Sequence, residues 1–106
     1  GVQTCALPIF RACTGKQYPV IHLIGGGAQS GLLCQMTANA CGLPVVAGPV
    51  EATVYGNTMA QFMALGELNG LTQARRALAN TLHTVVYEPR DREIWEEAYE
   101  RYREIL

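Results

Sequence analysis

The stretch that most constrains the fold is VIHLIGGGAQSGLL at residues 20–33, where an apolar run rich in β-branched residues ends at three consecutive glycines. Apolar residues at helical spacing resume within a few positions, so the pattern predicts a buried strand, a tight turn and a helix. Adjacent glycines permit positive φ angles and leave a main chain that a ligand can approach closely. The helix would direct its unpaired N–H groups at the same turn, which suits a phosphate or the polar edge of a ring. A nucleotide is the expected ligand, and the alternative is that the glycines only form a sharp turn.

The residues after this turn complete a predicted βαβ unit. Ser30 is placed to cap the helix, Gly42 is placed to end it, and LPVVA at residues 43–47 predicts a second strand. A right-handed crossover would make the two strands parallel. The loop at residues 48–53 then follows the carboxyl end of a strand, where ligands of open α/β sheets bind, so we expect it to face the same cleft as the glycines. The apolar positions expected to pack this helix are Leu32, Leu33, Met36, Ala40 and Cys41.

The first strand carries one polar residue, His22, between apolar neighbours. We therefore expect this strand to be covered on both faces. No carboxylate or nucleophile lies near His22 in the sequence, so we interpret it as a hydrogen-bonded core or edge histidine without a catalytic role.

The second half of the chain predicts helices around one extended segment. Residues 54–65 predict a helix in which Gly56 costs about 1 kcal/mol relative to alanine, so we expect another backbone or a ligand to approach closely there. Residues 71–82 predict a helix with Arg75 and Arg76 on a solvated face, and residues 84–89 an extended segment. The tail alternates acidic and basic residues and predicts an amphipathic helix docked by its aromatic side chains. Its apolar stripe is Ile94, Trp95, Tyr99, Tyr102 and Leu106.

Composition narrows the class of protein. Eight basic and nine acidic residues give a formal net charge of -1, so neither a nucleic-acid-binding surface nor an acidic tail is indicated. The charged share is 16% and the hydrophobic share 49%, against about 25% charged in an average domain, so part of the apolar surface is expected to lie against something else. No apolar run reaches the roughly 18 residues that cross a bilayer, and we expect a cytoplasmic location.

The cysteines and histidines predict neither a metal site nor a disulfide. The four cysteines form no CxxC pair, and the two histidines are far apart in the sequence. Cys34 and Cys41 would be separated by about 10 Å along one helix, too far for a disulfide. We interpret both as small, buried apolar residues in a reducing compartment.

Two motifs carry a resemblance to a known family. IGGGAQS at residues 24–30 and GPVEATVYGN at residues 48–57 resemble the C-terminal domain of the FGGY carbohydrate kinases. Within that family, Gly-Pro-Val-Glu-Ala-Thr is similar to the members that act on L-rhamnulose. The resemblance covers residues 10–106. Residues 1–9 instead look like a translated adapter sequence and are expected to be a non-native leader.

The resemblance implies an α/β fold that is the C-terminal part of an actin-like, ribonuclease-H-like ATPase domain. This part would be incomplete and would consist of the βαβ unit and the C-terminal helices. It implies transfer of the ATP γ-phosphoryl group to the 1-hydroxyl of L-rhamnulose, giving L-rhamnulose 1-phosphate, with Mg²⁺ spreading the charge. No residue of this chain is implied to be catalytic or to bind metal. The nucleotide-binding residues implied are Gly25, Gly26, Gly27 and, as a weaker match, Ser30, while Glu51, Thr53 and Gly56 are implied to support the turn.

The family's phosphate-binding loop, sugar-binding residues and aspartate base lie upstream of these motifs, so the resemblance makes this chain roughly the last fifth of such an enzyme. We expect it to be inactive alone, with ATP, Mg²⁺ and the ketose held mainly by the missing part. It is also expected to self-associate through exposed apolar surface. Neither nucleic acid nor a membrane is an expected partner.

Two other classes stay open on the residues alone. In a Rossmann-type dinucleotide-binding fragment the glycines would also follow a strand, but residues 25–30 match G-x-G-x-x-G only loosely, with Ser30 in the third place. That fold also needs an acid at the end of the second strand, and none occurs before Glu51. A P-loop is excluded because no Gly-Lys-Ser/Thr follows the glycines. The other class is a non-catalytic structural or interaction module.

Overall fold

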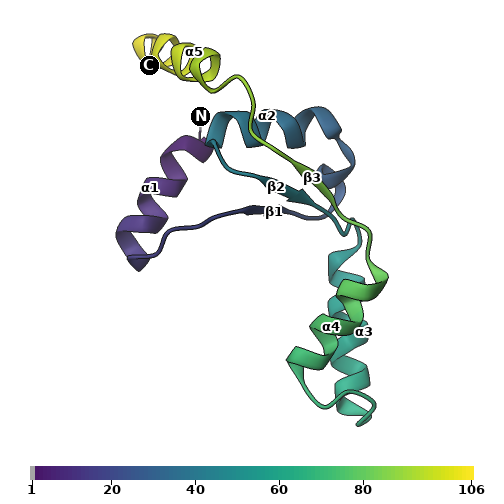
Figure 1. Ribbon diagram of the computed structural model, residues 1–106. Coiled ribbons are helices and arrows are strands. Elements are labelled where there is room, and N and C mark those ends of the chain that lie inside the picture. The colour runs from purple at the N-terminus through teal and green to yellow at the C-terminus, as the bar shows by residue number, and fades with distance from the viewer. Residues whose placement is uncertain (1) are drawn as a thin grey trace.

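The computed structural model describes the backbone of residues 2–106 and the side chains of residues 7–106. Figure 1 shows a small sheet with one helix lying along it and a helical hairpin that extends away from it. In chain order the described elements are α1 (Val2–Thr14), β1 (Ile21–Leu23), the short 3-10 helix η1 (Gly26–Gln29), α2 (Gly31–Cys41), β2 (Val45–Ala47), α3 (Ala52–Ala64), α4 (Leu71–Thr81), β3 (Val85–Tyr87) and α5 (Arg92–Ile105).

The sheet has the strand order β1-β2-β3, with β2 in the centre. β1 runs parallel to β2, with His22 opposite Val46, and this confirms the predicted βαβ unit. β3 pairs with the other side of β2 in the antiparallel direction, with Val86 opposite Val46. The sequence predicts only that residues 84–89 are extended, because their pairing depends on where α3 and α4 return the chain.

α2 begins and ends at the residues that the sequence predicts. Ser30 caps its start, where the Ser30 side chain accepts a hydrogen bond from the backbone N–H of Leu33 at 3.2 Å. Gly42 caps its end in a left-handed conformation, with φ 63° and ψ 26°, and its N–H donates to the carbonyl of Ala38. Glycine adopts this conformation at little cost, which is why helices often end there. The first turn of α2 therefore begins at Gly31, after η1 and Ser30.

The core lies between α2 and β2. Cys34 and Ala38 of α2 are fully buried against Val45 and Ala47 of β2. The predicted face of α2 is wrong, because three of its large members are exposed: Leu32 by 73%, Leu33 by 46% and Met36 by 43%. Apolar residues occur on most sides of this helix, so periodicity could not select one face. The small side chains face the sheet because they allow the helix to approach three-residue strands closely.

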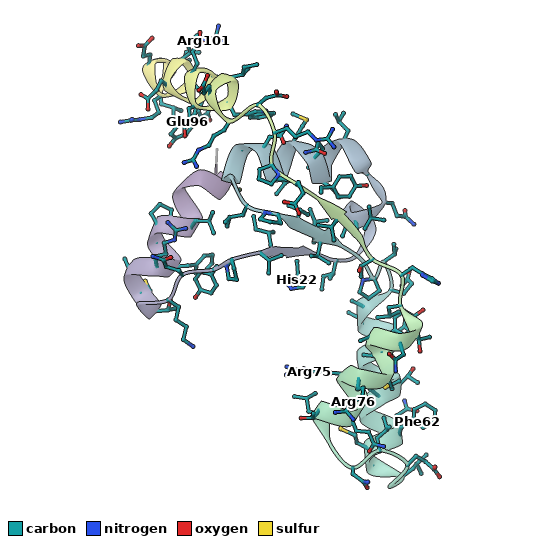
Figure 2. The ribbon with its side chains drawn as sticks, in the orientation of Figure 1. His22, Phe62, Arg75, Arg76, Glu96 and Arg101 are labelled. Atoms are coloured by element: carbon teal, nitrogen blue, oxygen red, sulfur yellow. The ribbon has the colours of Figure 1, made fainter. Side chains whose placement is uncertain are left out.

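The opposite face of the sheet is left uncovered by the described residues. His22, Val46 and Val86 share this face, because they occupy the same register position in their strands. His22 is exposed, and Val86 is 55% exposed. Figure 2 shows His22 pointing away from α2. The prediction that β1 is covered on both faces is therefore wrong for this chain, and His22 is an edge residue.

α1 packs against α2 and does not cover the open face of the sheet. It ends at Thr14 and is followed by Gly15, which has a φ of 67°. It begins at Val2 and includes Pro8. Gly1 and the side chains of residues 2–6 lie outside the described part, and the non-native origin of residues 1–9 stays a prediction.

α3 and α4 pack on each other as a hairpin that leaves the sheet at one end (Figure 1). No residue of α3 is buried, and Phe62 is 41% exposed. Arg75 and Arg76 are exposed on α4, which confirms the predicted solvated face (Figure 2). The radius of gyration is 17.1 Å, whereas a compact domain of about 100 residues has one near 13 Å. The chain is therefore elongated.

α5 docks through only part of its predicted stripe. Trp95 and Tyr99 are half-buried, whereas Ile94, Tyr102 and Leu106 are exposed by 64%, 48% and 86%. Docking by aromatic side chains is thus confirmed for the first two and wrong for Tyr102. Among the described residues, no helix combines the length and the hydropathy required to cross a membrane.

Candidate functional site

The three glycines after β1 have three different environments. Gly25 has φ 79° and ψ -163°, a conformation that is essentially restricted to glycine. A Cβ atom on Gly25 or Gly26 would meet no atom within 4 Å, so the main chain is open at both positions. A Cβ atom on Gly27 would lie 3.3 Å from Cδ2 of Leu23. The shape of the turn therefore depends on Gly25, its open surface on Gly26 and its packing on Gly27.

Main-chain hydrogen bonds join this glycine corner (residues 25–27) to the loop after β2. The N–H of Gly25 donates to the carbonyl of Pro49 at 3.1 Å, and the N–H of Gly48 donates to the carbonyl of Leu23 at 2.9 Å. The N–H of Ala28 returns to the carbonyl of Gly25 at 3.0 Å. The predicted proximity of the two loops is confirmed. The sequence did not indicate Pro49, because its contribution is a carbonyl group that every residue type carries.

Two backbone N–H groups at the corner have no hydrogen-bond partner among the described residues. Gly26 and Gly27 begin η1, and within the described residues neither of their N–H groups has a hydrogen-bond partner. The hydroxyl of Ser30 accepts from Leu33 and keeps its own proton available to donate. The corner can therefore present hydrogen-bond donors next to a flat, bare main chain.

One of the two thiols of α2, that of Cys34, lies against the glycine corner. Cys34 is fully buried, and its Sγ lies 3.8 Å from the carbonyl oxygens of both Gly27 and Ala28. Burial raises the pKa of the Cys41 thiol at the end of the same helix, because desolvation disfavours the thiolate. Cys34 therefore supports the corner by packing, whereas Cys41 lies at the far end of α2.

The acidic loop and the following helix contribute less to the corner than the resemblance implies. Glu51 precedes α3 without capping it through its side chain, and Glu51 and Thr53 are exposed. A Cβ atom on Gly56 would meet no atom within 4 Å, so the close backbone approach predicted there is wrong for the described residues. The contacts from this side to the corner come from the backbone of Gly48 and Pro49.

Tyr87 is a neighbour of the corner that sequence reasoning missed. Its ring packs against the core, and its hydroxyl lies 3.2 Å from the place that a Cβ atom on Gly31 would occupy. Gly31 starts α2 directly after Ser30. The end of β3 is therefore packed against the first turn of the helix that follows the glycines.

No group of metal-binding side chains marks the corner among the described residues. Among the described residues, no group of three His, Cys, Asp or Glu side chains could hold a metal ion. One surface hollow lies between the end of α2 and α5, lined by residues that include Gly42 and Trp95, and another lies at the start of α4. Both are away from the glycines. The open main chain of Gly25 and Gly26 is therefore separate from these two hollows.

Comparisons with known proteins place this geometry in context. The model of the FGGY family of carbohydrate kinases, C-terminal domain, matches residues 6–65, which include β1, the glycine corner, α2, β2 and α3. The rhamnulokinase of Bacteroides thetaiotaomicron is 41% identical over 93 residues, which are 88% of this chain and 19% of that protein. The chain thus spans about a fifth of the length of this curated relative.

Proposed function

This chain belongs to the FGGY family of carbohydrate kinases, and from that premise we propose that its glycine corner binds the nucleotide in a kinase that transfers the ATP γ-phosphoryl group to L-rhamnulose. The observation that carries the proposal is the open main chain at Gly25 and Gly26, inside the matched range. The sugar is inferred from the name of the relative, rhamnulokinase, and the product would be L-rhamnulose 1-phosphate.

The residues proposed to hold ATP or ADP are Gly25, Gly26, Gly27 and Ser30. The absence of a Cβ atom over the first two gives a base or ribose room to lie on the backbone. The unpaired N–H groups of Gly26 and Gly27 can donate to the polar atoms of such a ligand. Bound ATP supplies the phosphoryl group, and Mg²⁺ would be held by its phosphates and by the upstream part of the enzyme.

The rest of the machinery is proposed to lie upstream. The general base, the sugar site and the second wall of the cleft would belong to the remainder of an actin-like, ribonuclease-H-like ATPase fold. Two features support this view: the parallel pair β1–β2 with its crossover helix, and the outer edge of β1, which has no paired strand among the described residues. We propose residues 10–106 as the C-terminal portion of that fold, cytoplasmic, and inactive as a kinase by themselves.

A titration of ADP and ATP into the purified chain, followed by the amide NMR signals, tests the nucleotide proposal. We expect shifts at residues 25–30 and at least a tenfold loss of affinity in Gly26→Val, because the added side chain occupies the open surface. Gln61→Ala, on the exposed side of α3, is the control and should bind as the wild type does. Equal affinity in Gly26→Val, or shifts confined to other regions, would contradict the proposal.

Two further titrations separate the alternatives. NAD⁺ bound at the corner more tightly than ADP would favour a Rossmann-type fragment, and no nucleotide binding at all would favour a structural module. ATP and L-rhamnulose should yield no sugar phosphate with this chain alone. Formation of L-rhamnulose 1-phosphate would overturn the view that the base and the sugar site lie elsewhere.

A further inference from the structure

Two amide side chains on α2 hold the segment that joins β3 to α5. The Nε2 of Gln35 donates to the carbonyl of Glu88 at 2.7 Å and to Oδ1 of Asn39 at 2.8 Å. The same Oδ1 accepts the backbone N–H of Arg90 at 2.8 Å. The bonds to Glu88 and Arg90 connect residues more than fifty positions apart in the sequence. We call Gln35 and Asn39 the amide pair.

The backbone partners determine how both amides are oriented. A carbonyl can only accept, so the NH₂ group of Gln35 must face Glu88. A backbone N–H can only donate, so the oxygen of Asn39 must face Arg90. With both orientations set, the bond between the two side chains runs from Gln35 to Asn39. Asn39 is 9% exposed, which protects its bonds from competition with water.

The segment held by the amide pair carries contacts to both ends of α2. Tyr87 directly precedes Glu88 and reaches Gly31 at the first turn of α2, next to the glycine corner. At the other end, the guanidinium carbon of Arg92 lies 3.8 Å from the place of a Cβ atom on Gly42. The amide pair lies between these two contacts. Loss of the bonds made by the amide pair would loosen the contact of Tyr87 with the start of α2. It would also loosen the contact of α5 with the end of α2.

We propose that Gln35 and Asn39 are positioning residues of the glycine corner, which act by holding residues 88–90 on α2 and thereby keeping Tyr87 against its first turn. The statement that the corner so positioned is a nucleotide site rests on the proposed function. Neither side chain is proposed to touch the nucleotide, and the effect on the corner passes through α2.

α3 offers a matched control for this pair. Gln61 donates to Asn57 at 3.3 Å, again between an asparagine and a glutamine four residues apart on one helix. That pair is exposed, and within the described part of the chain Gln61 makes no side-chain bond to the backbone of another segment. Substitutions at Gln61 therefore change the same kind of side chain without releasing a segment.

The test uses three variants of the amide pair in the whole chain, one control variant and two NMR readouts. Asn39→Ala removes the acceptor and should speed hydrogen exchange of the Arg90 N–H about tenfold, as expected for loss of a part-buried hydrogen bond. It should also shift the amide signals of residues 26–31. Gln35→Glu should do the same, because a carboxylate would face the carbonyl of Glu88 and the oxygen of Asn39. Asn39→Asp keeps an acceptor for both donors and should retain protection at Arg90.

The outcomes distinguish this proposal from the proposed function. The control variant Gln61→Glu should leave both NMR readouts unchanged. The affinity for ADP should fall about three- to tenfold in Asn39→Ala but less than twofold in Asn39→Asp. If the wild type binds no ADP, the nucleotide proposal fails, and the exchange of Arg90 with the shifts at the corner still decides the role of the pair. Unchanged exchange or corner shifts in Asn39→Ala, or identical behaviour of Asn39→Ala and Asn39→Asp, would overturn the positioning role.

Discussion

At the scale of single residues, two glycines of the corner meet different requirements: Gly25 a backbone conformation and Gly26 an open surface. Gly25 has a backbone conformation that other residues adopt only with strain, although space for a side chain is present. Gly26 lies in the same open space without a positive φ. Folding therefore depends on the first glycine, whereas ligand access depends on the second.

This difference predicts that alanine at Gly25 lowers stability, whereas alanine at Gly26 lowers nucleotide affinity. Gly25→Ala should lower the free energy of unfolding by about 1–3 kcal/mol, because alanine is strained at this φ and ψ. Gly26→Ala should change it by less than about 0.5 kcal/mol and should weaken ADP binding instead. Thermal unfolding and ADP titration of both variants check this. Equal losses of stability would show that the conformation of Gly25 is not the limiting feature.

At the scale of elements, α5 illustrates how little surface charge contributes compared with aromatic contact. Arg92 and Glu96 form an ion pair of 2.7 Å, and Arg101 lies 4.0 Å from Glu97, but all four side chains are more than 60% exposed (Figure 2 labels Glu96 and Arg101). Exposed pairs of this kind contribute about 0.3–0.5 kcal/mol each to a helix. The docking of α5 therefore depends on its half-buried aromatic side chains.

Trp95 and Ile94 form a matched test of this dependence. Trp95→Ala should lower the free energy of unfolding by about 1–2 kcal/mol and detach α5 from the end of α2, because a half-buried indole is lost. Ile94→Ala should have an effect below about 0.5 kcal/mol, since Ile94 is 64% exposed. Amide exchange across residues 92–105 reports the detachment. A larger effect of Ile94 would mean that α5 docks through its other face.

At the scale of the whole molecule, the sheet has one covered and one uncovered face. α2 covers the side of Val45 and Ala47, and the described residues leave His22 and Val86 exposed on the other side. The outer edge of β1 has no paired strand among the described residues. An exposed apolar sheet face next to an open edge is a typical site of association.

The uncovered face predicts self-association of the isolated chain. Sedimentation velocity should show concentration-dependent dimers or larger species, and Val86→Lys should shift the population toward monomer, because it adds a charge to the apolar face. Ile105→Lys, at the exposed end of α5, should leave the distribution unchanged. A wild-type chain that stays monomeric at all concentrations would contradict the prediction.

Local signals determined the elements of this protein and much of its candidate site. The glycines after a β-branched run, Ser30 as an N-cap and Gly42 as a left-handed C-cap act through backbone conformation within a few residues. They therefore predicted the strand, turn, helix and parallel strand that the structure contains. The proximity of the glycine corner to the loop after β2 followed from the same topology, because the carboxyl ends of parallel strands meet at one edge.

Only the tertiary structure decided which surfaces meet. The buried face of α2 consists of small residues such as Cys34 and Ala38, and periodicity favoured larger neighbours, because apolar residues lie on most sides of that helix. The uncovered side of His22, the pairing of β3 and the bonds of Gln35 and Asn39 depend on segments up to 53 residues away. No local sequence pattern indicates such contacts. Their backbone partners are N–H and carbonyl groups, which almost every residue carries.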